Sequence, residues 1–126
     1  MTSSKNKYGN KKVTIDGHTF DSKKEANYYL YLRELERRGE IRDLRLQVPY
    51  EIIPAIYETR IKHLKTKDKE ERKLVQKAVH YMADFVFTVV SSGKEEVVDT
   101  KGFRTEAYRL KKKMMRAFLG IEIQEI

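Results

Sequence analysis

The chain has 126 residues, of which 37% are charged, and its 27 Lys and Arg against 19 Asp and Glu give a formal net charge of +8. This is the size of one domain, and the basic excess favours a polyanionic partner, most commonly nucleic acid. The lack of cysteine excludes disulfides, thiolate zinc sites and cysteine nucleophiles, and it fits a reducing cytoplasm. No signal peptide or membrane-spanning segment stands out, so we expect no membrane partner.

The first residues predict a tail followed by a small hairpin. Residues 1–12 are polar and rich in lysine, which is typical of a flexible basic arm. Residues 13–20 surround Asp16-Gly17, a strong signal for a two-residue hairpin turn. We expect residues 13–126 to form a single domain.

A helix and a strand are expected next. Residues 22–38 carry apolar side chains at helical spacing, between Ser22 as a good N-cap and Gly39 as a good helix stop. Residues 44–53 are typical of a strand, which Pro54 ends.

The segment at about 55–79 gives the weakest pattern. It is crowded with Lys, Glu and Arg and has few apolar residues, so we expect a charged excursion that is partly helical. Its lysines could contact a nucleic-acid backbone without reading the sequence of bases. These are Lys62, Lys65, Lys67 and Lys69.

The second half of the chain predicts two strands, a helix and a last short strand. The strands are expected at 80–90 and 95–101, the helix at 105–119 and the last strand at 121–126. The order helix-strand-strand-strand-helix-strand indicates an α/β fold in which helices flank a mixed sheet.

Asp84 is an acid that the pattern places inside the fold. In a regular strand, Tyr81, Ala83, Phe85 and Phe87 share one face and Asp84 lies on the other. A charge in so apolar a strand is costly unless it is paired. Asp84 therefore belongs to a structural salt bridge, to a strand end that lies near water, or to a charged site.

Asp99 and Lys101 lie two residues apart on the following strand and point the same way. This is also the pattern of an ordinary surface ion pair. If the turn between the strands is at Ser92-Gly93, Asp84 faces Lys101. Asp99 then lies on the diagonal, and all three side chains share one face of the sheet.

Glu25 lines up with the apolar stripe of the first helix, which should pack on the sheet, so its carboxylate can aim at Asp84. The same glutamate completes a capping box with Ser22, in which it reaches back to the N-cap backbone. Local chemistry alone favours the cap. Clustered carboxylates with a lysine nearby are, however, what metal-assisted phosphodiester hydrolysis requires.

The ordered set of motifs resembles the PD-(D/E)XK nuclease superfamily, which has the restriction-endonuclease-like fold. It is also similar to a phage-associated family of small proteins catalogued as a domain of unknown function. The likeness covers most of the chain from Lys7 to Ile126, apart from the charged excursion. The motifs are Ser22-Lys23-Lys24-Glu25 ahead of a helix, Gln47 in the next strand, Tyr81-Met82-Ala83-Asp84-Phe85, and Asp99-Thr100-Lys101-Gly102 ahead of a lysine-rich helix.

The resemblance implies a four-stranded mixed sheet flanked by helices and a Mg²⁺-dependent deoxyribonuclease, in which Mn²⁺ can substitute. By motif position, Asp84 and Asp99 would bind the metal, with Glu25 as an accessory ligand. Lys101 would help to activate water or stabilise the transition state. Gln47 would support a ligand or contact DNA.

The last helix carries an apolar and a basic stripe. The basic stripe is placed to meet DNA phosphates, although it could equally be a solvated face. The apolar stripe is Ala107, Leu110, Met114 and Phe118, and the basic stripe is Arg109, Lys112, Lys113 and Arg116.

These observations predict an endonuclease that acts on DNA, with branched recombination or replication intermediates of a phage or mobile element as candidate substrates. It would work in the cytoplasm of a bacterial host if it is phage-derived. A homodimer is compatible with this size, but the sequence shows no decisive interface. The alternatives are a non-catalytic DNA-binding protein that keeps the nuclease fold, and a structural or adaptor protein.

Overall fold

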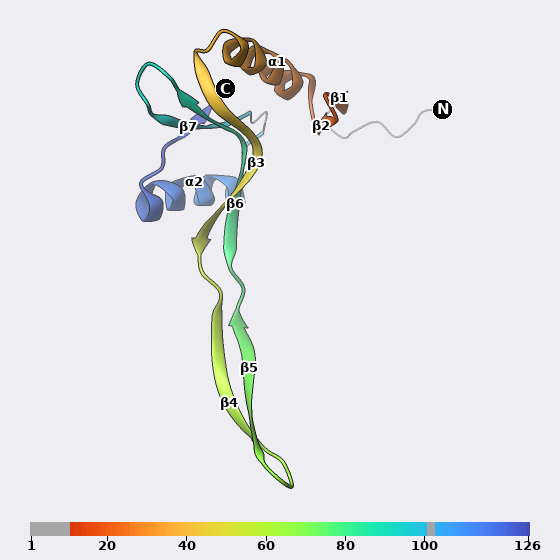
Figure 1. The fold of residues 1–126 in the computed structure, drawn as a ribbon, viewed down its shortest axis with the longest axis vertical. Coiled ribbons are helices and arrows are strands. Elements are labelled where there is room, and N and C mark those ends of the chain that lie inside the picture. The colour runs from red at the N-terminus through yellow and green to blue at the C-terminus, as the bar shows by residue number, and fades with distance from the viewer. Residues whose placement is uncertain (1–10, 101–102) are drawn as a thin grey trace, which may run out of the picture.

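The structure is a computed structural model that describes residues 11–100 and 103–126 (Figure 1). The predicted flexible arm and Lys101 therefore lie largely or wholly outside the described residues. The elements in chain order are β1 (Val13–Ile15), β2 (His18–Phe20), α1 (Lys23–Arg37), β3 (Ile41–Ile53), β4 (Ile56–His63), β5 (Asp68–Gln76), β6 (Val79–Val89), β7 (Glu95–Asp99), α2 (Glu106–Leu119) and β8 (Ile123–Glu125).

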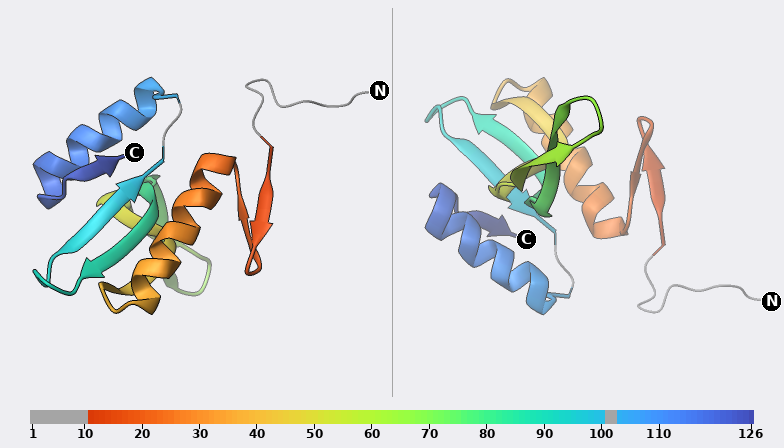
Figure 2. Two further views of the ribbon diagram at one scale, coloured as in Figure 1. Left: turned by 90° about the horizontal axis from the view of Figure 1, so that it is seen from above. Right: turned by 90° about the horizontal axis from the view of Figure 1, so that it is seen from below.

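A four-stranded mixed sheet in the order β3-β6-β7-β8 forms the centre of the fold. Its first three strands pair antiparallel, and β8 pairs parallel with β7. In Figure 2 the sheet lies between α1 and α2. The predicted element order and the mixed α/β class with a four-stranded sheet and two helices are confirmed. In the described part of the chain, no helix is long and apolar enough to cross a membrane.

Each helix packs on the sheet through its own apolar core. The core beside α1 consists of Phe20, Ala26, Tyr29, Leu32, Ile41, Phe85, Phe87 and Val98. The core beside α2 consists of Ile52, Tyr81, Ala83, Val86, Val97, Tyr108, Met115 and Ile123.

The predicted hairpin and first helix form as their turn and cap residues require. Asp16 and Gly17 have φ values of 53° and 80°, the left-handed backbone of a type I′ turn. The Ser22 Oγ accepts a hydrogen bond from the Glu25 backbone N–H at 3.2 Å, and Gly39 has a φ of 76° just beyond the helix. Short-range sequence signals therefore fix both ends of α1.

The charged excursion is a long two-stranded ribbon, so the expectation of partial helix is wrong. β4 and β5 pair antiparallel from Ile56 opposite Gln76 to His63 opposite Asp68. Every residue in both strands is exposed, and Figure 1 shows the ribbon running away from the sheet in line with β3 and β6. Because neither face is buried, the sequence lacks the apolar alternation that identifies a strand.

The expected alternation along β6 is wrong at Asp84. Ala83 packs in the core beside α2, whereas Phe85 packs in the core beside α1. Residues two apart in a regular strand would share a face. The neighbouring strand is irregular at the same place, because Gln47 has a left-handed φ of 51°. The two strands thus deform together beside Asp84.

The hairpin between β6 and β7 has a four-residue loop instead of a tight turn. The Val89 N–H donates to the Lys94 carbonyl oxygen at 2.8 Å, which closes the loop. The resulting register, continued by one pair, puts Asp99 opposite Asp84, where Lys101 was expected. The predicted register is therefore wrong by two residues, because Ser-Gly is a weak turn signal.

Candidate active site

Asp84 is held by hydrogen bonds from both neighbouring segments. Its Oδ2 accepts from the Thr100 backbone N–H at 3.0 Å and from the Thr100 Oγ1–H at 2.9 Å. Its Oδ1 accepts from the Gln47 Nε2–H at 3.2 Å. The left-handed backbone of Gln47 and the residue after β7 together fix the orientation of this half-buried carboxylate.

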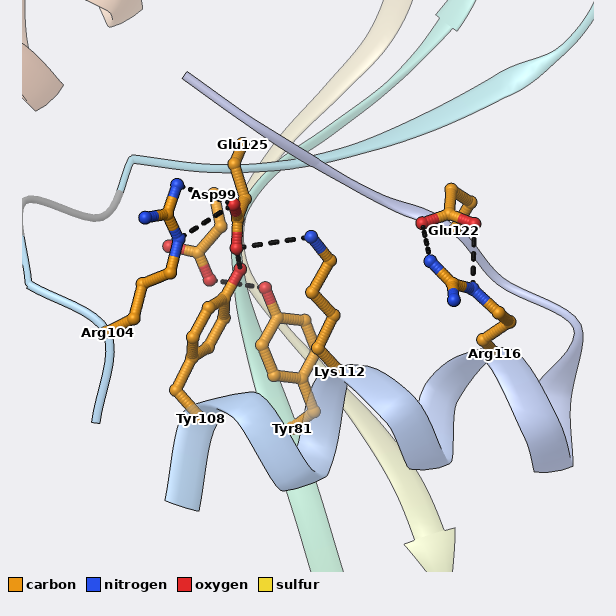
Figure 3. A network of polar contacts seen from close by, with 8 residues as sticks. All are labelled: Tyr81, Asp99, Arg104, Tyr108, Lys112, Arg116, Glu122 and Glu125. Atoms are coloured by element: carbon orange, nitrogen blue, oxygen red, sulfur yellow. Dashed lines mark hydrogen bonds and ion pairs between the residues drawn. The ribbon is translucent and has the colours of Figure 1, made fainter. Parts of the chain in front are cut away.

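Asp99 ends β7 with no exposed surface. Its Oδ2 accepts a hydrogen bond from the hydroxyl of Tyr81 on β6 (Figure 3). Burial, together with this bond to Asp99, raises the pKa of Tyr81 well above its usual range, so the hydroxyl remains a donor. Sequence reasoning gave Tyr81 no role, although a buried tyrosine normally needs a partner for its hydroxyl.

Glu25 is a buried carboxyl at the start of α1, with 7% of its surface exposed. Its pKa rises from 4.5 to about 7, first because of burial and then because of the negative charges of Asp84 and Asp21, with a smaller contribution from Asp99. The charges of the predicted acids on β6 and β7, Asp84 and Asp99, therefore act on the third predicted acid, Glu25 on α1. A nearby cation would favour the ionised form of Glu25.

The donor set matches a magnesium site in kind. Carboxylate oxygens are hard ligands, and Mg²⁺ commonly takes one or two of them while keeping several waters. Across residues 11–100 and 103–126, no three Asp, Glu or His side chains are grouped so as to hold a metal ion. The described carboxylates therefore do not form a closed cage of three protein ligands.

A pocket of about 410 Å³ opens beside Glu25. Glu25 and Gln47 are its polar side chains from α1 and β3, and Gln47 also bonds Asp84. Its volume is in the range of small-molecule sites. A group that enters this pocket meets Glu25 and the glutamine that bonds Asp84, whereas Asp84 and Asp99 do not line it. The pocket is lined by Gly17, His18, Thr19, Phe20, Glu25, Leu44, Leu46 and Gln47.

A second polar network joins α2 to the last strand (Figure 3). Glu125 accepts hydrogen bonds from the Arg104 Nε–H at 2.8 Å and from the Tyr108 hydroxyl at 2.7 Å. The Lys112 Nζ lies 3.2 Å from its Oε2. The Arg104 and Tyr108 hydrogen bonds are the largest causes that lower the pKa of Glu125 to about 2. This network, absent from the sequence reasoning, anchors β8 beside the strand that carries Asp99.

Two of the four residues in the predicted basic stripe of α2 form ion pairs within the protein. Lys112 engages Glu125, and Arg116 engages Glu122 with an Nη2–Oε2 distance of 2.6 Å. Arg109 and Lys113 make no ion pair with any described residue. A pocket of about 450 Å³ is lined by Arg104, Arg109, Lys112, Lys113, Arg116 and Glu125.

The predicted apolar stripe of α2 is mostly not the face that packs on the sheet. Leu110 and Phe118 are 57% and 61% exposed, whereas Tyr108 and Met115 are buried. Tyr108 is buried because its ring packs in the core while its hydroxyl reaches Glu125. The buried face is thus rotated away from the one that hydrophobic spacing indicated.

The fold and site define a mixed α/β protein with interacting carboxylates where two helices and a kinked sheet meet. More specifically, the chain belongs to the family described as protein of unknown function (DUF1064), whose sequence profile matches residues 5–123. No curated protein and no solved structure matches the chain.

Proposed function

We propose that the protein is a Mg²⁺-dependent DNA endonuclease with the restriction-endonuclease-like fold of the PD-(D/E)XK superfamily. The main support is geometric. Asp84 and Asp99 each lie one residue beyond the pair of Phe85 and Val98 on adjacent antiparallel strands, and the charges of both acids contribute to the raised pKa of Glu25 on α1. The Asp99-Thr100-Lys101 sequence then puts a lysine just after the second acid, as the superfamily motif requires.

The proposed roles assign the metal to the acids and the orientation of one acid to a neighbouring threonine. Bound Mg²⁺ would polarise the phosphate and lower the pKa of the attacking water. Asp84 and Asp99 would bind the metal, and Glu25 would add charge or hold a proton at its carboxyl. Thr100 stops the Asp84 carboxylate from rotating, because it donates two hydrogen bonds to Oδ2.

Other residues would support the site or the substrate. Tyr81 orients Asp99 through its hydroxyl, and Gln47 on the neighbouring strand β3 holds Asp84 through its side-chain amide. Lys101 would stabilise the negative charge that develops on the phosphate. Arg109 and Lys113, with the excess of basic residues in the chain, would bind the DNA backbone.

The proposal is tested with labelled DNA and either Mg²⁺ or Mn²⁺. The substrates are linear duplex, nicked duplex, flaps, four-way junctions and single strands. We expect wild-type protein to cut at least one of them, and Asp84→Asn and Asp99→Asn to lose cleavage while keeping DNA binding. Asp43→Asn is a matched control, because Asp43 is exposed on β3 with a φ of 55°, a backbone conformation that asparagine tolerates.

The result that overturns the proposal is a wild-type protein that cuts none of these substrates with either metal. If such a protein still binds DNA with strong salt dependence, it is a DNA-binding protein that keeps the fold without catalysis. If it neither cuts nor binds, a structural or adaptor role remains.

A further inference from the structure

The ribbon formed by residues 56–76 contributes nothing to either core. All residues of β4 and β5 are exposed, and these strands contact one another far more than they contact any other element. An isolated two-stranded hairpin is at best marginally stable in water. Its side-chain contacts include Arg72, whose Cζ lies 3.9 Å above the ring centre of Tyr57. Packing therefore contributes little to the stability of the ribbon, and the ribbon contributes little to the stability of the two cores.

Positive charge is concentrated at the end of the ribbon. Arg60, Arg72 and Lys73, nearer the sheet, are balanced in number by Glu58, Glu70 and Glu71. At the far end, residues 62–69 hold four lysines and one aspartate, and that aspartate already contacts His63 at 2.8 Å. We call Lys62, Lys65, Lys67 and Lys69 the ribbon tip.

The charges of the ribbon tip destabilise the pairing of its two strands. Lys62 and Lys69 pair directly across the two strands, and like charges in that position are destabilising. A polyanion bound at the tip would remove this repulsion. Leu64 is the single large apolar side chain within residues 62–69, whereas protein interfaces have aromatic and apolar centres and few lysines. The composition of the tip thus favours phosphate over a protein surface.

We propose that the ribbon tip binds the backbone of duplex DNA at a distance from Glu25, Asp84 and Asp99, which we call the acid cluster. This inference rests on the proposed function, because it takes DNA as the partner. A two-stranded ribbon is narrow enough to enter the major groove, and lysines bind phosphates by releasing counterions. The tip therefore adds affinity and orientation without reading the bases.

The length of the ribbon sets the size of the DNA site. Fifteen residues separate Lys69 from Asp84 along β5 and β6. At about 3.3 Å per residue Lys69, at the base of the tip, lies at most about 50 Å from Asp84. This corresponds to about 15 base pairs at about 3.4 Å each. Duplex that extends this far to one side of the acid cluster can contact both the cluster and the tip, so long duplex should gain more from the tip than short duplex.

The test measures DNA binding in EDTA, where metal-dependent cleavage cannot occur. Wild-type protein is compared with a variant that carries Lys→Gln at all four tip positions and with a control that carries Lys→Arg at the same positions. Labelled duplexes of about 8 and about 40 base pairs are titrated over a range of salt concentrations. Circular dichroism verifies that each variant is folded.

We expect the glutamine variant to bind the long duplex at least about tenfold more weakly than wild type, with a salt slope lower by about 3. On the short duplex the difference between the two proteins should be smaller, because a short duplex cannot contact the tip and the region of Asp84 at the same time. The arginine variant should behave as wild type. A second variant, in which residues 57–75 are replaced by Asn-Gly, should match the glutamine variant if the ribbon acts through its tip.

Equal binding of long duplex by wild-type and glutamine proteins overturns the inference, as does an arginine variant as weak as the glutamine variant. Sedimentation that shows tip-dependent self-association without DNA also overturns it, in favour of a second copy of the chain. Cleavage assays separate this from the proposed function. A protein that cuts nothing but binds long duplex through its tip supports the ribbon inference while the nuclease proposal fails.

Discussion

Replacing Tyr81 by phenylalanine removes one oxygen atom and leaves the buried ring in place. The lost hydroxyl donates to the Oδ2 of Asp99, which has no exposed surface. A hydrogen bond to a charged group contributes about 1.5–3 kcal/mol, and a buried acceptor cannot turn to water for a replacement. We therefore expect Tyr81→Phe to lower the free energy of unfolding by about 2 kcal/mol.

Denaturant titration in EDTA measures this change, and Tyr31→Phe on α1 is the matched control. Tyr31 is 55% exposed, so the loss of its hydroxyl should change the free energy of unfolding by less than about 0.5 kcal/mol. A double-mutant cycle with Asp99→Asn isolates the interaction, and we expect a coupling energy of about 1 kcal/mol or more.

The same substitution separates a positioning role from a purely structural one. If Tyr81 orients Asp99 for metal binding, Tyr81→Phe should raise the Mg²⁺ concentration needed for half-maximal cleavage by about tenfold, as is typical when the partner of a metal ligand is lost. DNA affinity in EDTA should remain unchanged. A coupling energy near zero, or a stability loss no larger than that of Tyr31→Phe, would refute the reasoning.

Three further changes have expected outcomes. Thr100→Val keeps the side-chain shape but removes the Oγ1–H that bonds Asp84, so cleavage should fall about tenfold in single-turnover kinetics. The free energy of unfolding should fall less than for Tyr81→Phe, by about 1 kcal/mol in denaturant titration, because Asp84 is only half-buried and keeps its bond from the Thr100 backbone N–H. The pKa of Glu125 is lowered to about 2, so its stabilising contribution is complete above about pH 5 and is lost as the pH falls towards 2. Glu125→Gln should remove about 1–2 kcal/mol of this pH-dependent stability, allowing for screening by solvent, and denaturant titrations at several pH values measure it. Gly39→Ala should lower the free energy of unfolding by about 1 kcal/mol, because alanine is strained at a φ of 76°.

Local signals gave the correct elements because each depends on a few adjacent residues. Asp16-Gly17 specifies its turn, and Ser22 and Gly39 delimit α1. The ribbon was not predicted because its strands bury neither face, so their charged residues carry no periodic apolar signal. The buried face of α2 was misassigned because Tyr108 packs through a ring and bonds through a hydroxyl, a combination that hydrophobic spacing does not register.

The acid cluster depends on long-range geometry that the sequence pattern only outlines. The motifs identified Asp84, Asp99, Glu25 and Gln47 as a group, and the hydrogen bond from Gln47 to Asp84 agrees with the supporting role expected for this glutamine. The partners Tyr81 and Thr100 were not predicted, because their contacts follow from a register that the weak Ser-Gly turn could not specify.

The backbone irregularity at Gln47 and Asp84 changes which residues of β6 face each helix. A regular β6 would keep Ala83 and Phe85 on one face, but here they enter different cores. Strain at Gln47, a non-glycine residue with a φ of 51°, is tolerated where its amide reaches Asp84. A regular strand also supplies apolar side chains to both faces, as Phe85 and Val86 do here, so the deformation is not needed to serve both helices. Its effect is to exchange the faces of β6 at Asp84, beside the strained residue whose amide holds that carboxylate. Strain of this kind is often kept at functional sites, which favours a role for Asp84 beyond packing.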